Sequence, residues 1–556
     1  MQRQQTAYWT SWIRNSVYNG QEDWTWFDRY DDVVNRLTID DVAQYARHVL
    51  RDAYKVKAVL LPADAKLLPV TSYQLPPTVS GAVFVDRNGN GVQDKGEKGL
   101  KGIPVSNGDT IVVTDRQGHY ELPYVEGNSV MPILPANYTM GGSPVVNANF
   151  LYMVGGGKGN VEDVDFPLVK KTVNRRFRLN AVGDVQVSNY QELDYAARSL
   201  WPELLEPDGE APATINLFLG DLVNNNLQLY GDLRTMMEQL PRQTWTVLGN
   251  HDRDVDTVRW RQSQSYNETF GADMYAFNEG RTHIIVLNNV YGDGPRGYTG
   301  YLSDRQLNFV RQDLQYVPDD VLVVLSMHIP LAHTKNSDRL LALLEGRGDV
   351  LAVTGHMHQV GRFFLEGRGV RIHELSAGAS CGFWWVGERG VDGVPSALQQ
   401  CGTPRNYFVI DFDDTRYTMR CKAVGEDAAR QMTIHVTGID TLDNYQRDMK
   451  MVPAGLLMMT VYGGCDSTEV RCRIDGGEWL LCHKDSLMDP NVARIREMNH
   501  LRAYPTKYNR LNPLRRVKGR QLWTLPLPAD CRRGAHSVEV EALDRWGFRA
   551  TGRRSF

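Results

Sequence analysis

The chain has 556 residues, too many for one hydrophobic core, so we expect roughly three or four domains. Hydrophobic residues make up 42% and charged residues 23%, which is typical of a globular protein and excludes a largely disordered one. The net charge of -4 is small for this length, so neither nucleic acid nor an anionic membrane is expected as a partner.

The first 70 residues are predicted to form helices followed by a strand. Thr38, Asp40 and Asp41 make an acidic helix start, and the segment KVKAVLLP is typical of a strand. The run from YNGQEDWTWFDRYDDVVNRLTIDDVAQYARHVL to VLLP, within residues 1–65, resembles the C-terminal tail of pitrilysin-like (insulinase-type) zinc peptidases. The HxxEH zinc motif of that family is absent, so the resemblance implies no peptidase activity.

Targeting signals and cysteine spacing give little further information. No stretch approaches the roughly 18 apolar residues of a membrane span, and the start, MQRQQTAYWTSWIRN, lacks the apolar core of a signal peptide. Of seven cysteines, five follow residue 420 without CxxC metal spacing, which leaves free thiols and partial disulfides both open.

Residues 75–172 are predicted to form a small Ig-like β-sandwich, because short alternating strands are separated by turn residues. Within it, one loop has the oxygen spacing of a calcium site and a glycine for a sharp turn. Its candidate ligands are Asp86, Asn88, Asn90, Val92, Asp94 and Glu97. The loop resembles those of bacterial B-type surface repeats, which implies a structural calcium ion. The alternative is a solvated turn rich in Asn, Asp and Gly.

Residues 173–415 alternate apolar runs with helical stretches, as in an α/β or α+β domain of layered sheets. Five of the apolar runs end in groups that can bind metal: Asp184 and Gln186, Asp221, Asn250 and His251, His328, and His356 and His358. Strands of such a domain place their carboxyl ends at one crevice, so we expect these groups to converge. Imidazoles mixed with carboxylates and an amide suit Zn, Fe or Mn better than Ca or Mg.

The motifs GDVQ, GDLVNN, GNHD, SMH and GHMH follow the order found in calcineurin-like metallophosphoesterases, which this segment of about 240 residues resembles. The resemblance implies hydrolysis of a phosphomonoester or phosphodiester by hydroxide bridging two metal ions. It assigns Asp184, Gln186, Asp221 and His358 to the first ion. It assigns Asp221, Asn250, His328 and His356 to the second. His251 is implied as the general acid or transition-state stabiliser beside the leaving oxygen.

Two positions depart from the commonest pattern of that family. Gln186 stands where many members have histidine, and Asn224 stands where some have an aspartate that orients the catalytic histidine. These departures favour an alternative function, a binding protein of the cell envelope with weak turnover or none. The presence of Asn250, His251 and both histidines of GHMH favours the enzyme.

Substrate contacts are predicted in a glycine-rich stretch, ELSAGASCGFWWVGERGVDGVP, which follows the last metal motif. Trp384 and Trp385 either pack on an apolar or sugar-like leaving group or fix the loop into the core. Tyr291, Arg296 and Tyr298 are further candidates for the cleft.

Residues 416–556 complete the chain with a predicted β-rich domain. The expected fold is therefore a layered β-sandwich metallophosphoesterase core between an N-terminal Ig-like domain and this C-terminal domain. The expected substrate is a small-molecule or lipid-linked phosphate ester. The calcium-type loop and the peptidase-like segment both favour the periplasm or the cell surface.

Overall fold

The computed structural model describes Thr38 and residues 77–556, except 156–158, 207–212, 295, 439–451, 501–513 and 516–518. The chain divides into two compact units, Met1–Gln74 and Leu75–Phe556. The predicted helices and strand of residues 1–70, with their likeness to a peptidase tail, lie outside the described residues. In the described part, no helix has both the length and the apolar character needed to cross a membrane.

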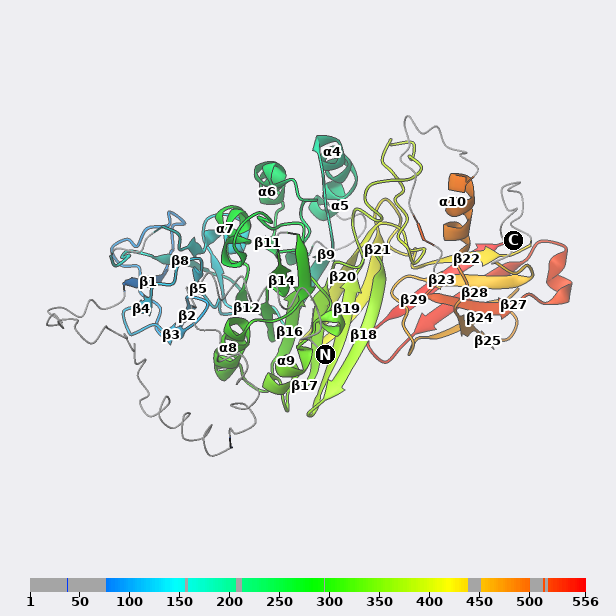
Figure 1. Cartoon of the computed structure of the whole chain (residues 1–556). Coiled ribbons are helices and arrows are strands. Elements are labelled where there is room, and N and C mark those ends of the chain that lie inside the picture. The colour runs from blue at the N-terminus through cyan, green and yellow to red at the C-terminus, as the bar shows by residue number, and fades with distance from the viewer. Residues whose placement is uncertain are drawn as a thin grey trace, which may run out of the picture. The chain divides into compact units, whose positions relative to one another are not determined.

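The N-terminal domain consists of two four-stranded sheets, drawn in blue and cyan in Figure 1. One sheet has the order β4 (His119–Pro123), β1 (Thr78–Val85), β8 (Phe166–Lys170), β6 (Tyr138–Met140). The other has the order β3 (Ile111–Val113), β2 (Pro104–Ser106), β5 (Ser129–Pro132), β7 (Leu151–Tyr152). A β-rich N-terminal domain is thus confirmed, whereas its Ig-like type stays a prediction.

The predicted calcium loop follows β1 directly. Its acidic side chains bind the loop's own backbone: Asp86 accepts from the N–H groups of Gly89 at 2.7 Å and Gly91 at 2.9 Å. Glu97 accepts from the N–H of Asp94 at 3.0 Å. These hydrogen bonds do not test the calcium site, which stays a prediction.

The central domain contains two larger sheets, coloured from teal through green to yellow in Figure 1. The five-stranded sheet has the order β11 (Gln243–Thr246), β10 (Ile215–Phe218), β9 (Arg176–Val182), β20 (Asn406–Asp413), β21 (Arg416–Ala423). The six-stranded sheet has the order β12 (Tyr275–Glu279), β13 (Thr282–Val286), β16 (Leu322–Met327), β17 (Gly348–Thr354), β19 (Val370–Ala377), β18 (Val360–Gly367). Strands β9–β11 are parallel to one another, as are β13, β16, β17 and β19.

Side-chain alternation along the strands builds two hydrophobic layers in this domain. Leu217 of β10 packs between the sheets with Leu325 of β16, while the next residue, Phe218, packs on the other face. There it meets Trp201 and Leu233, which belong to a helical layer. The domain's helices are α4 (Tyr190–Ser199), α5 (Trp201–Leu205), α6 (Tyr230–Glu238), α7 (Gln264–Phe270), α8 (Asp304–Asp313) and α9 (Ser337–Leu343). This is the mixed α/β core expected from the sequence.

The central domain extends beyond the expected boundary at residue 415. Strand β21 pairs antiparallel with β20 from Asn406↔Ala423 to Asp413↔Arg416, so the five-stranded sheet continues to Ala423. The sequence DDTR at this boundary, residues 413–416, is the turn of the β20–β21 hairpin. Turn residues mark a chain reversal equally well inside a sheet and between domains.

The C-terminal domain has two four-stranded sheets and a helix, α10 (Pro490–His500). One sheet has the order β22 (Met432–Val436), β23 (Leu456–Val461), β27 (Leu522–Pro526), β26 (His483–Asp485). The other has the order β25 (Leu480–Leu481), β24 (Glu469–Ile474), β28 (Ser537–Leu543), β29 (Arg549–Ser555). All seven cysteines of the chain are buried free thiols, the first of the two alternatives left open.

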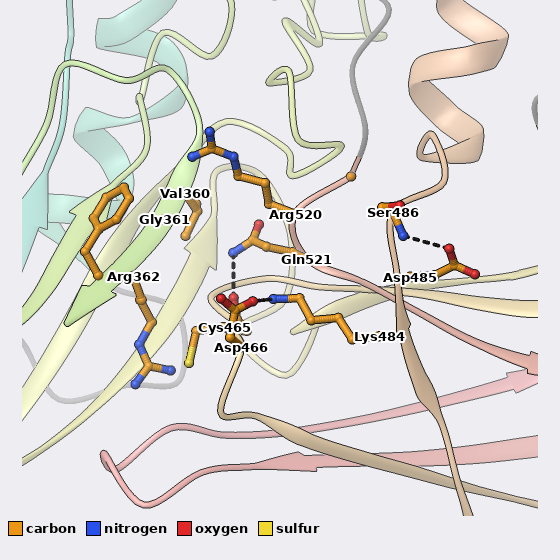
Figure 2. A pocket seen from close by; sticks show the side chains of 13 residues that line it. Val360, Gly361, Arg362, Cys465, Asp466, Lys484, Asp485, Ser486, Arg520 and Gln521 are labelled. Atoms are coloured by element: carbon orange, nitrogen blue, oxygen red, sulfur yellow. Dashed lines mark hydrogen bonds and ion pairs between the residues drawn. The ribbon is translucent and has the colours of Figure 1, made fainter. Parts of the chain in front are cut away.

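A pocket of about 850 Å³ separates β18 of the central domain from the C-terminal domain. Figure 2 shows its wall residues, among them the ion pair between Lys484 and Asp466. At its side the two domains are joined by Arg362, whose guanidinium binds Asp544 at 2.5 and 3.3 Å. Both side chains are 0% exposed. This buried ion pair therefore links β18 of the central domain to the C-terminal domain.

Asp544→Ala is expected to destabilise the protein by about 3–5 kcal/mol, because the partner Arg362 would remain buried without a counter-charge. Thermal unfolding measures this, with Asp413→Ala as the control. Asp413 pairs with Arg176 on the surface, where such a pair contributes about 1 kcal/mol or less.

Burial opposes the charge on Asp544, but Arg362 holds its pKa below the usual value. The contribution of this ion pair to the free energy of unfolding is therefore present above about pH 4 and is lost as the pH falls further. Equal midpoints for the two variants would contradict the assignment.

Candidate metal centre

All the predicted metal ligands lie just beyond the carboxyl ends of central strands. Asp184 and Gln186 follow β9, Asp221 follows β10, Asn250 follows β11, His328 follows β16, and His356 and His358 follow β17. The first three strands belong to the five-stranded sheet and the last two to the six-stranded sheet. The crevice therefore forms where the parallel strands of both sheets end, as expected for α/β domains.

The glycines of the motifs allow these loops to approach one another. A Cβ on Gly249 would lie 2.0 Å from the backbone nitrogen of Asp221. A Cβ on Gly355 would lie 2.7 Å from Oδ2 of Asp184. Larger residues would therefore push the loops apart, which explains the glycine before Asn250 and before His356.

Backbone strain is concentrated at the predicted ligands. Thirteen non-glycine residues of the described chain have positive φ, and five of them are Asp184, Gln186, Asp221, His356 and His358. Such a conformation costs about 1–3 kcal/mol per residue and persists only where the surroundings enforce it. The fold therefore holds these side chains in one geometry at a cost in stability, which is typical of functional sites.

The second predicted ligand set converges on one point. His328 Nε2 lies 3.3 Å from Asp221 Oδ2 and 3.1 Å from Asn250 Oδ1. It also lies 3.2 Å from His356 Nδ1. One proton on Nε2 can satisfy a single one of these neighbours, whereas a cation accepts a lone pair from all of them. His328 Nδ1 binds Leu219 O at 2.7 Å, the outer contact that orients a ligating imidazole. These residues therefore fit a metal ion.

The first predicted ligand set is looser. His358 Nε2 lies 3.7 Å from Asp184 Oδ1, and its Nδ1 binds Gly382 O at 2.6 Å. Gln186 Nε2 lies 3.4 Å from Asp221 Oδ2, so the unusual glutamine does reach the centre. Among the described residues, donors of Asp221, His328 and His356 form the one group of three within 4.8 Å.

The electrostatics of the centre also favour a bound cation. Burial raises the pKa of Asp184 well above its usual value. Burial lowers the pKa of His356 to about 3 and that of His358 to about 4, so both imidazoles keep a lone pair at neutral pH. Burial opposes the charge on His328 as well, but Asp221 raises its pKa to about 9. A metal ion would displace that proton and neutralise the buried carboxylates.

His251 lies beside these groups, next to Asn250 and Asp221. Its backbone N–H donates to Asp221 Oδ1 at 2.8 Å, while its Nδ1 is buried with no hydrogen-bond partner among the described residues. Asn224 donates instead to Ser188 Oγ at 3.0 Å. Burial lowers the pKa of His251. No carboxylate of the described chain therefore orients this imidazole, in line with the departure noted at Asn224.

Asp252 is an important residue that sequence reasoning missed. Its fully buried carboxylate accepts from the N–H groups of Leu222 at 2.9 Å, Val223 at 3.2 Å and Gly249 at 2.8 Å. These bonds tie the loop of Asp221 to the loop that carries Asn250. Burial, with Asp221 nearby, raises its pKa to about 7. The available signal was a carboxylate directly after His251 in GNHD.

The two candidate tryptophans have different environments. Trp385 is 3% exposed, and its indole N–H donates to Val185 O at 2.8 Å, so it fits the packing alternative. Trp384 is 38% exposed, and its ring lies 5.2 Å from that of His358. Tyr298 is 39% exposed and lies 5.9 Å from the ring of His356. Trp384 and Tyr298 therefore border the metal centre.

Solved structures that match the chain include three with low identity. A purple acid phosphatase from yellow lupin (Lupinus luteus) is 10% identical, with 57% of this chain and 66% of that chain covered and a TM-score of 0.33. Zinc-bound Vps29 from Entamoeba histolytica is 14% identical, with coverages of 44% and 97% and a TM-score of 0.20. The sulfate thiohydrolase SoxB from Thermus thermophilus is 14% identical, with coverages of 44% and 43% and a TM-score of 0.23. No curated protein matches the chain.

Family models match three consecutive segments of the chain. Residues 177–360 match the model for calcineurin-like phosphoesterase. Residues 87–171 match the N terminal of calcineurin-like phosphoesterase, and residues 374–549 match its C terminal. None of the three models extends before residue 87, so they give no support to the peptidase-like tail. The chain therefore belongs to the calcineurin-like phosphoesterases and is a metallophosphoesterase whose central domain carries that family's N-terminal and C-terminal domains.

Proposed function

We propose that this enzyme hydrolyses a phosphomonoester or phosphodiester with two metal ions of the Mn, Zn or Fe type. The proposed ligands of the first ion are Asp184, Gln186, Asp221 and His358. Those of the second are Asp221, Asn250, His328 and His356. Two ions held by these residues would neutralise charge on the phosphate oxygens and would make hydroxide available near neutral pH.

The observation that carries the proposal is the position of Asp221. Its Oδ2 lies 3.4 Å from Gln186 of the first set and 3.3 Å from His328 of the second. One carboxylate thus touches both predicted sets, which is the role of a bridging ligand. Its other oxygen, Oδ1, receives the backbone N–H of His251 and so fixes that residue next to the bridge.

His251 is the proposed donor to the departing oxygen. Because its Nδ1 is buried, the nitrogen left for a substrate is Nε2. A hydrogen bond from this nitrogen stabilises the negative charge that develops on the leaving group. The side chain lies outside both ligand sets, so it can act on the substrate without holding metal.

The proposal is tested by metal analysis of the purified protein and by hydrolysis of bis-p-nitrophenyl phosphate and p-nitrophenyl phosphate. Mn, Zn, Fe and Ca are added separately. We expect about two ions per chain and turnover with a transition metal but not with Ca, because nitrogen donors suit the former. The preferred ester then narrows the substrate class.

The second candidate function is a binding protein with weak turnover or none. Two observations favour it: Gln186 is a neutral donor, and His251 Nδ1 has no orienting carboxylate among the described residues. Two bound ions, with no cleavage of either test ester or of a panel of natural phosphate esters, would support this candidate against the enzyme.

A further inference from the structure

Trp384 is held in an exposed position that its backbone disfavours. Both Trp384 and the next residue, Trp385, have positive φ, 62° and 48°. Bulky residues rarely adopt this conformation, and it persists where the surroundings enforce it. The double distortion buries Trp385 and turns Trp384 outward beside His358. The loop thus exposes a large apolar ring next to a proposed metal ligand.

Tyr298 occupies the corresponding place beside His356. It lies on the hairpin formed by β14 (Val290–Asp293) and β15 (Gly297–Gly300). The guanidinium of Arg253 lies 5.4 Å from its ring, and Arg253 Nε also donates to Asn250 O at 3.1 Å. The hairpin is therefore tied to the loop that carries Asn250, which keeps the tyrosine ring near the metal centre.

The C-terminal domain supports Trp384 through contacts with its own loop. The ring of Phe383 lies 4.3 Å from that of Trp384. Phe383 itself is buried in a cluster with Leu398 and with Met488 and Val492 of the C-terminal domain. Further along the same loop, Thr403 Oγ1 donates to Gln521 at 3.1 Å. Residues more than 100 positions later in the chain therefore fix the loop that presents the indole.

We propose that Trp384 and Tyr298 bind a ring on the substrate's leaving group, and that the C-terminal domain positions Trp384 for this contact. This inference rests on the proposed phosphoesterase function. Two half-exposed aromatic rings, each next to a proposed metal-binding histidine, offer flat surfaces on which a ring can stack. Aryl, nucleoside and sugar phosphates all carry a ring on the leaving group, whereas glycerol phosphate does not.

The test compares p-nitrophenyl phosphate, a nucleoside monophosphate and glucose 6-phosphate with glycerol phosphate in the wild type and in Trp384→Ala. We expect KM to rise about tenfold for ring-bearing esters that the wild type prefers, with kcat, metal content and glycerol phosphate turnover unchanged. In Trp384→Phe, KM for ring-bearing esters should return most of the way to the wild-type value. Trp260→Ala, which removes another exposed indole, is the matched control and should behave as wild type. Equal losses on ring-bearing and ring-free esters would overturn the inference.

Met488→Ala tests the positioning role of the C-terminal domain. We expect a smaller rise in KM for ring-bearing esters at unchanged kcat. Leu457→Ala removes a buried side chain of similar size from a different cluster of that domain and should leave KM unchanged. The same KM in both variants would contradict the positioning role.

Binding of phosphonates separates this inference from the proposed function. Phenylphosphonate and methylphosphonate differ in the ring and are not hydrolysed as esters. If the wild type cleaves no ester, the proposed function fails, but tighter binding of phenylphosphonate that is lost in Trp384→Ala still supports the aromatic contact. Equal affinity for the two probes overturns it.

Discussion

Asp221→Ala is expected to remove metal from the protein and to lower turnover by about a thousandfold or more. The reason is geometric, since Oδ2 of Asp221 lies 3.4 Å from the amide nitrogen of Gln186 and 3.3 Å from Nε2 of His328, one residue from each proposed ligand set. Its loss would remove a proposed ligand of each ion and also the buried charge that pairs with His328. Metal content after dialysis and kcat on p-nitrophenyl phosphate measure the two effects.

The control for this variant is Asp194→Ala, which removes an exposed carboxylate paired with Arg198 on α4. It should retain the metal and the full rate. Asp221→Ala also removes the acceptor of the His251 N–H, so circular dichroism is needed to show that the fold is kept. A folded Asp221→Ala protein with two ions bound would disprove the bridging role.

The variant His251→Ala is expected to retain both metal ions, whereas its kcat should fall by a factor of about 10²–10⁴. This factor is the usual contribution of a positioned proton donor. The side chain belongs to neither ligand set, and its buried Nδ1 makes no hydrogen bond in the described chain that would be lost with it. Metal analysis and kcat therefore separate a catalytic role from a structural one.

The matched control is His483→Ala, because His483 lies exposed in β26 of the C-terminal domain. It should leave the rate unchanged. An unaltered rate in His251→Ala would remove this residue from the mechanism. A poor leaving group, such as an alkyl phosphate, should show a larger loss than p-nitrophenyl phosphate, since it depends more on stabilisation of the departing oxygen.

Sequence order alone predicted which side chains meet at the centre. Asp184, Asp221, Asn250, His328 and His356 each follow an apolar run, and parallel strands end at one edge. The structure brings them together as expected, although the identity of each ligand stays a proposal. Asp252 was missed because its role depends on contacts with the backbone N–H groups of Leu222 and Gly249, which the motif GNHD by itself does not show.

The substrate side of the crevice was less predictable. The doublet of Trp384 and Trp385 fits both a core anchor and a substrate contact, and the structure divides the two roles between adjacent residues. The choice depends on backbone torsions and on packing against Phe383 and Met488, none of which a local pattern records.

By itself the sequence determined the mixed α/β central domain, its β-rich neighbours and the family, because strand periodicity and closely spaced motifs are local properties. Only the tertiary structure decided that the central sheet runs on to Ala423, that Gln186 reaches Asp221 and that the C-terminal domain supports Trp384. Each of these depends on contacts between residues far apart in the chain. Such contacts are set by the packing of whole elements, which no short stretch of sequence specifies.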